Sequence, residues 1–157
     1  MAQNPEKIIQ FLNQNLIDES KKLLDNELYN SLLVHIAQGI EVLGAFLDAK
    51  PLRARDQSRT RFDAAIHQFF PPAYRRANAD SWLYKHYRTH VIHTFLPGSH
   101  LLPVSRKAQP DAVHLSNRGA KLVLVYENLQ MDYQLAVNQL IKEISAGSVK
   151  SKMMEGL

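Results

Sequence analysis

The chain has 157 residues and no cysteine, and its 19 Lys and Arg against 15 Asp and Glu give a net charge of +4 with neutral histidine. This length suits one domain with a core of its own, and the missing cysteine excludes a disulfide framework and thiolate chemistry. A charge excess this small permits an anionic partner but does not require one.

The N-terminal sequence and the hydropathy pattern predict a protein without membrane segments. Residues Met1 to Glu6 lack the basic and then apolar pattern of a signal peptide. No run approaches the roughly 20 apolar residues that a membrane helix needs. Because a chain without cysteine also agrees with a reducing compartment, we expect a cytoplasmic location.

Two helices are predicted in the first third of the chain. Residues 8–16 form a short helix, and residues 18–48 give the strongest helical periodicity, with a break near Asn26 that would divide it. The small residues of this helix let a second helix approach closely, so we expect it to be central. They are Ala37, Gly39, Gly44 and Ala45. The apolar stripe consists of Leu28, Leu32, Ile36, Ile40, Leu43 and Leu47.

Two further helices follow, each bounded by proline. One begins near Ser58 and ends at Pro71, and the next runs from Trp82 to about Phe95, with Asn78 or Asp80 as its N-cap and Pro97 beyond its end. Their inward-facing residues are Phe62, Ala65, Ile66 and Phe69 in the first helix, and Leu83, Tyr87, Val91 and Phe95 in the second.

The pattern then changes to three short β-like runs at 101–105, 113–116 and 121–126, which read as a hairpin or small meander. A last helix covers 127–144, with one apolar face. We therefore predict a mainly α fold, a bundle of four to five helices with a small antiparallel β-hairpin inserted before the last helix. Residues 1–146 would form this single domain, and 147–157 a flexible tail.

Residues 84–98 carry the chemistry, because they hold three of the seven histidines and an arginine. Arg88 offers a bidentate fork for a phosphate, and His93 can transfer a proton near neutral pH. Five helical steps place the two side chains about 140° apart. One helix therefore does not readily bring both to one phosphate, and a bent last turn or a second copy of the helix is needed. The pair suits cleavage of RNA, whose 2′-hydroxyl can be the nucleophile without a metal.

The stretch Arg88–His93, an Arg-x-x-x-x-His motif near a helix end, resembles the signature of HEPN (higher eukaryotes and prokaryotes nucleotide-binding) domains. Residues 82–88 and 94–98 look like the start and end of the helix that carries this motif, and 29–47 is similar to the long early helix of those domains. The resemblance implies a helical bundle that is usually dimeric. In catalytic members the motifs of two subunits meet and cut RNA without metal.

Carried onto this sequence, the resemblance makes Arg88 and His93 the catalytic pair of a metal-independent endoribonuclease, with Thr89 and His90 as neighbouring binding residues. It implies a homodimer, an RNA or nucleotide partner, and no cofactor. Thr89 stands where active members often have Asn, Asp or His. Many relatives are non-catalytic interaction or nucleotide-binding modules, and this second reading stays open.

Two alternatives concern the same stretch. His86, His90 and His93 fall within about 60° on one helix face and could bind Zn²⁺, with His35 or Glu41 as further ligands, although no HExxH motif is present. Arg88 could instead have a structural role and pair with Glu41 or Asp48.

Basic residues precede the motif and extend into it. In one interpretation Lys85, Arg55 and Arg59 bind a phosphate backbone; in the other, which we favour, they form a solvated face that Asp56 and Asp63 compensate. The whole basic set is Arg53, Arg55, Arg59, Arg61, Arg75, Arg76 and Lys85.

Overall fold

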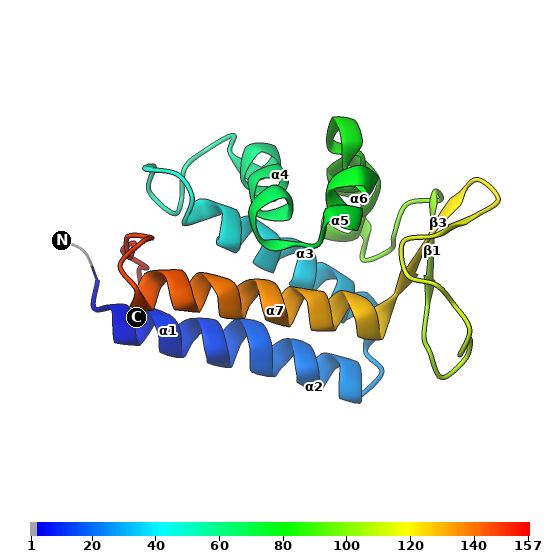
Figure 1. Cartoon of the computed structure of the whole chain (residues 1–157), viewed down its shortest axis with the longest axis horizontal. Coiled ribbons are helices and arrows are strands. Elements are labelled where there is room, and N and C mark those ends of the chain that lie inside the picture. The colour runs from blue at the N-terminus through cyan, green and yellow to red at the C-terminus, as the bar shows by residue number, and fades with distance from the viewer. Residues whose placement is uncertain (1–2) are drawn as a thin grey trace.

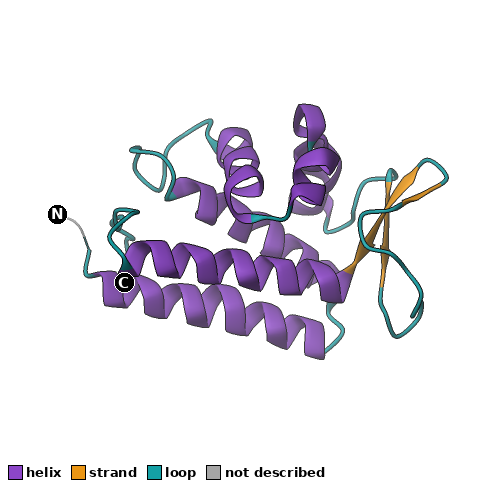
Figure 2. Ribbon diagram, viewed as in Figure 1, coloured by secondary structure: helices purple, strands orange, loops and turns teal. Residues whose placement is uncertain are grey.

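The structure, a computed structural model, describes residues 3–157, and it consists of packed helices with a small sheet at one end (Figures 1 and 2). The first helical rod comprises α1 (Pro5–Phe11), a π-helical stretch η1 (Leu12–Asp18) and α2 (Glu19–Asp25). It begins where the Asn4 side chain accepts a hydrogen bond from the Glu6 amide, with proline in the first turn. The rod breaks at Asn26, as the sequence predicts.

The remaining helices are α3 (Tyr29–Ala45), α4 (Ser58–Phe69), the short α5 (Pro72–Ala77), a 3₁₀ turn at Ala79–Ser81, the π turn η3 (Tyr84–Arg88), α6 (Thr89–Thr94) and α7 (Tyr126–Ser145). In Figure 1, α7 lies beside the first rod and runs in the opposite direction. Helix α3 contacts α2, α4, α6 and α7, so its predicted central position is confirmed.

Glycines in α3 allow two neighbours to approach closely. A Cβ on Gly39 would lie 1.9 Å from the Tyr133 hydroxyl oxygen on α7, and one on Gly44 would lie 1.9 Å from the carbonyl oxygen of Arg61 on α4. No side chain fits at either position. Gly39 and Gly44 therefore mark two places where helices pack closely against α3.

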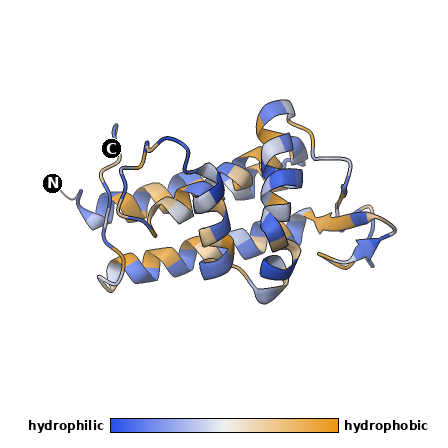
Figure 3. Ribbon diagram, turned by 90° about the horizontal axis from the view of Figure 1, so that it is seen from above, coloured by the Kyte–Doolittle hydropathy of each residue, from blue (hydrophilic) through white to orange (hydrophobic). Residues whose placement is uncertain are grey.

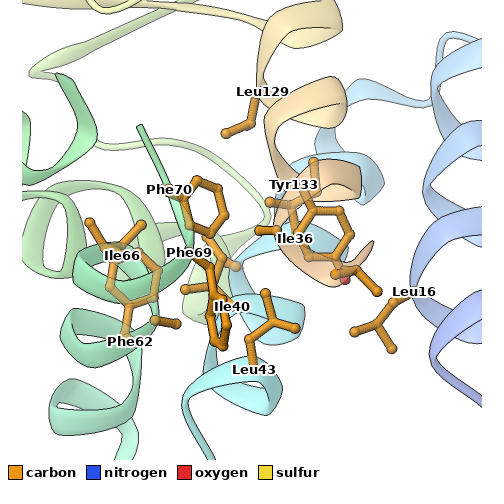
Figure 4. Packing of buried hydrophobic residues seen from close by; sticks show 14 of the residues in the cluster. Leu16, Ile36, Ile40, Leu43, Phe62, Ile66, Phe69, Phe70, Leu129 and Tyr133 are labelled. Atoms are coloured by element: carbon orange, nitrogen blue, oxygen red, sulfur yellow. The ribbon is translucent and has the colours of Figure 1, made fainter. Parts of the chain in front are cut away.

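The predicted apolar stripes form the core. Figure 4 shows Phe62, Ile66 and Phe69 of α4 facing Ile36 and Ile40 of α3, and Figure 3 shows hydrophobic and hydrophilic positions alternating along the helices. The stripe of α7 is buried throughout, at Leu129, Tyr133, Ala136, Leu140 and Ile144.

Two predicted stripe positions are wrong. Leu28 is 53% exposed because it precedes α3, and Phe95 is 58% exposed because its left-handed backbone (φ +60°) ends α6 and turns the side chain outward. Asn78 is the N-cap that the sequence offers for this helix, since its Oδ1 accepts from the amides of Leu83 and Tyr84.

The sheet contains β1 (Leu101–Val104), β2 (Asn117–Arg118) and β3 (Lys121–Val125) in the order β1-β3-β2. The prediction of a mainly α fold with a small β insertion is confirmed. The antiparallel pairing holds only for β2 and β3, because β1 pairs parallel to β3.

The predicted strand at 113–116 is wrong. These residues form a turn in which Leu115 has φ +60°. Leu115 and Ser116 still exchange backbone hydrogen bonds with Val123 at 2.8 Å, but regular pairing with β3 is confined to Asn117 and Arg118. The long connection after β1 carries the chain back across the end of the bundle. Two parallel strands require a long connection of this kind, because the chain must return to the end at which the first strand began.

The tail beyond α7 folds back onto the start of the chain. Ser151 donates to the Gln3 carbonyl, Lys152 pairs with Asp48 at 2.8 Å, and Met154 is buried. The flexibility predicted for 147–157 stays a prediction. Within residues 3–157, none of the helices combines the length and apolar character needed to span a bilayer.

Candidate functional site

Arg88 is held between three helices. Its Nε forms an ion pair with Glu41 on α3, its Nη2 lies 3.3 Å from the Ser58 hydroxyl on α4, and its guanidinium carbon lies 5.2 Å from the centre of the Tyr84 ring. Only 14% of the Arg88 side chain is exposed. The predicted pairing with Glu41 is confirmed, whereas Asp48 pairs with Arg61 instead.

A widened helical turn positions this arginine. The Thr89 amide donates to the carbonyl of Tyr84, five residues earlier, and the Thr89 hydroxyl donates to the same oxygen at 3.0 Å. The turn is therefore π-helical, a distortion that is frequent at functional sites. Thr89 stabilises the turn and is not free to contact a ligand through its hydroxyl proton.

His93 lies in the last turn of α6 and is exposed, without a side-chain hydrogen bond to any of residues 3–157. Phe95 and Leu96 beside it are also exposed, at 58% and 57%. Arg88 faces α3 and α4 while His93 faces solvent, which agrees with their predicted angular separation. One chain does not bring both groups to a single phosphate.

The residues that hold Arg88 also line a cleft of about 330 Å³ between α3, α4 and the loop that precedes α4. Its polar lining residues are Glu41, Ser58, Gln38, Gln57 and Arg61, and its apolar floor includes Val42. A ligand in this cleft would contact the carboxylate and the hydroxyl that anchor the guanidinium, so binding there would act directly on Arg88.

The basic residues divide into two kinds. Arg55, Arg59 and Lys85 are exposed, with Arg59 donating to the Ser81 hydroxyl at 2.8 Å and lying 3.9 Å from Asp63. Arg61 is not part of this surface, because it is 5% exposed and donates to Asp48 through Nε and Nη2. The Arg59–Asp63 pair agrees with a partly compensated face.

The three histidines of η3 and α6 do not converge. His86 packs against the rings of Trp82 and His100, His90 lies beside Gly98, and His93 is exposed. Burial lowers the pKa of His86, and the neighbouring His100 adds to this effect.

The zinc interpretation gains no support from these positions. In the part of the chain that the structure describes, no three His, Cys, Asp or Glu residues are grouped to hold a metal ion. The further ligands that it requires are engaged elsewhere, since His35 lies 3.2 Å from the Leu16 carbonyl and Glu41 pairs with Arg88.

A polar network that the sequence does not predict joins three distant elements. His114 Nδ1 accepts from the Val125 amide at 3.0 Å, so in the neutral ring the proton sits on Nε2, which lies 2.8 Å from the Tyr74 hydroxyl. Tyr74 in turn donates to Asp132 at 2.8 Å. Burial lowers the pKa of His114 to about 4 and raises that of Asp132.

Comparison of the chain with protein-family models, with curated proteins and with solved structures gives no match. The likeness to HEPN domains therefore depends on the residues of the motif and on the helices that carry them. The structure places Arg88, which is anchored, at the end of η3 and His93, which is exposed, on α6. Any function assigned to them is a proposal.

Proposed function

We propose that the chain is a HEPN-like domain that binds RNA as a homodimer, with Arg88 of η3 and His93 of α6 from the two copies forming one joint site. In this site Arg88 contacts the phosphate and His93 transfers a proton as the 2′-hydroxyl attacks, so no metal is needed. Exposed Lys85, Arg55 and Arg59 would add contacts to the phosphate backbone.

The observation that carries the proposal is the divergence of the two side chains on one helix. Arg88 is fixed by Glu41 and Ser58, while His93 is exposed beside the apolar side chains of Phe95 and Leu96. A second copy that packs on this apolar end would bring another exposed His93 into the neighbourhood, and burial of both side chains would stabilise the contact.

A non-catalytic binding module is the second candidate, and the ion pair favours it. The Glu41 carboxylate already neutralises Arg88, and a phosphate would have to compete with it or share the guanidinium. Nη1 of Arg88 has no hydrogen bond to residues 3–157 and is the nitrogen through which sharing could occur. In this form the domain holds RNA without cutting it.

Cleavage of labelled RNA in excess EDTA separates the two candidates, with DNA of the same sequence as substrate control. The catalytic form predicts that RNA is cut, that DNA is not, and that His93→Ala lowers the rate by about 100-fold or more. His67→Ala is the matched control, because His67 is also an exposed histidine but belongs to α4 and not to α6. It should leave the rate unchanged.

RNA that is bound but left intact would select the non-catalytic module. Equal loss of cleavage in the His93 and His67 variants would remove His93 from the site. RNA that is neither bound nor cut, across sequences of varied composition and structure, would overturn the proposal as a whole.

A further inference from the structure

A second hollow, of about 440 Å³, lies between α5, Trp82 and the hairpin of β2 and β3, and shares no lining residue with the cleft at Glu41 and Ser58. Its volume is in the range of small-ligand sites. Much of this space exists because alanines line it where larger side chains would fill it. These are Ala73, Ala77, Ala79 and Ala120.

Trp82 gives the hollow an aromatic wall. The indole is half-buried, and the rings of His86 and His100 contact it at centroid distances of 4.7 and 6.4 Å. These contacts fix the ring in place before any ligand arrives. Burial lowers the pKa of His86, which favours the neutral form of the imidazole that lies nearer the indole. Leu122 adds apolar surface from β3.

The rim of the hollow is basic. Arg76 lines it, is exposed, and forms no ion pair with any of residues 3–157. None of the lining residues carries a carboxylate, and exposed Arg118 and Lys121 follow on the hairpin. Asn117 offers an amide with both a donor and an acceptor.

We propose that this hollow binds a nucleotide, whose base stacks on Trp82 while Arg76 receives the phosphate and Asn117 contacts the base edge. An aromatic face accepts any base, and an unpaired guanidinium prefers a phosphate. The nucleotide can be free or a unit of single-stranded RNA. The inference does not depend on Arg88 or His93, so it can fail or hold separately from the proposed function.

The chain provides its own probe, because Trp82 is its one tryptophan. Fluorescence of the intact protein is followed at pH 8, above the ordinary pKa of histidine. The titrants are the four nucleoside monophosphates, adenosine, inorganic phosphate and a single-stranded RNA hexamer. We expect saturable quenching by the monophosphates and weaker binding of adenosine. Tighter binding of the hexamer than of AMP would identify an RNA unit as the source, and equal affinity a free nucleotide.

Two variants of equal charge give the control. Arg76→Gln should weaken binding about tenfold or more through loss of the charge-assisted contact, whereas Arg75→Gln on the same helix should not, because Arg75 lies outside the hollow. Ala120→Leu, in an exposed turn, should block the hollow while circular dichroism remains unchanged.

Three results would overturn the inference. The first is quenching that stays linear up to millimolar ligand. The second is an equal loss of affinity in the Arg75 and Arg76 variants, which would show a general charge effect. The third is unchanged affinity in a folded Ala120→Leu protein.

Discussion

Lowering the pH from 7 to 5 is expected to destabilise the protein through His114. The pKa of this residue is about 4 in the folded chain, against 6.5 for an exposed histidine, because burial disfavours its charged form. Between these values the unfolded chain binds more protons than the folded one, so the stability contributed by neutral His114 is complete above pH 6.5 and falls as the pH decreases toward 4.

The magnitude follows from the same two pKa values. Each unit of pKa difference corresponds to about 1.4 kcal/mol, so the loss is about 2 kcal/mol at pH 5 and at most about 3 kcal/mol below pH 4. The hydrogen bonds give the structural reason. Protonation of His114 Nδ1 would place two donors, that proton and the Val125 amide, against each other. Asp132, whose pKa burial raises, has the opposite sign and offsets part of the loss at the lowest pH.

Urea unfolding followed by circular dichroism at pH 7, 6 and 5 measures this effect. His114→Asn is the informative variant, because its side-chain oxygen can still accept from Val125 but does not titrate. It should be less stable than the wild type at pH 7 and show a much smaller loss between pH 7 and 5. Equal pH dependence of the two proteins would refute the reasoning.

The other predictions concern packing and charge around α3. Gly39→Ala should cost about 2 kcal/mol or more, because its Cβ would lie 1.9 Å from the Tyr133 hydroxyl oxygen. Tyr133→Phe should be neutral or stabilising, since this buried hydroxyl has no hydrogen-bond partner; a large destabilisation in urea would contradict that assignment. Glu41→Gln should lower the free energy of unfolding by about 2–4 kcal/mol, because Arg88 would stay nearly buried without its ion pair. The double variant Glu41→Gln, Arg88→Met should regain much of this stability, as measured by thermal unfolding.

The helices could be predicted because their signals are local. Apolar periodicity, Asn78 as a cap and the prolines after α4 and α6 are all read within a few residues of the element that they define. The small residues of α3 led to the correct prediction of its central position. Glycine destabilises a helix interior, so Gly39 and Gly44 indicate that neighbouring helices pack closely there. Short α5, between Pro71 and Asn78, is too brief to show a period and was not predicted.

The pairing of the strands could not be predicted from local sequence patterns. Residues 113–116 have the composition of a strand, but only Leu115 and Ser116 bond to β3, and they do so in a turn. The path of the loop after β1 decides which residues pair, and no local pattern encodes that path. The parallel register of Leu101 with Leu122 depends on the same path. Phe95 fits the apolar stripe of its helix, yet its backbone leaves the helix one residue too early.

Some contacts of the candidate site could also be predicted from the sequence, and others could not. The partner of Arg88 was among those that the sequence offered, because Glu41 and Asp48 are acids of one predicted helix, and only packing selects between them. The network of Tyr74, His114 and Asp132 had no sequence signal. Its members lie on α5, on the loop after β1 and on α7, and only the folded chain brings them together.

The most direct test of the joint site is native mass spectrometry of the protein with a short RNA analogue. The analogue contains 2′-deoxynucleotides, so it lacks the 2′-hydroxyl that cleavage requires. We expect complexes of two chains and one oligonucleotide, and we expect them to disappear when His93 or Arg88 is replaced. Complexes with one chain per oligonucleotide, or dimers that bind equally well without these side chains, would contradict it.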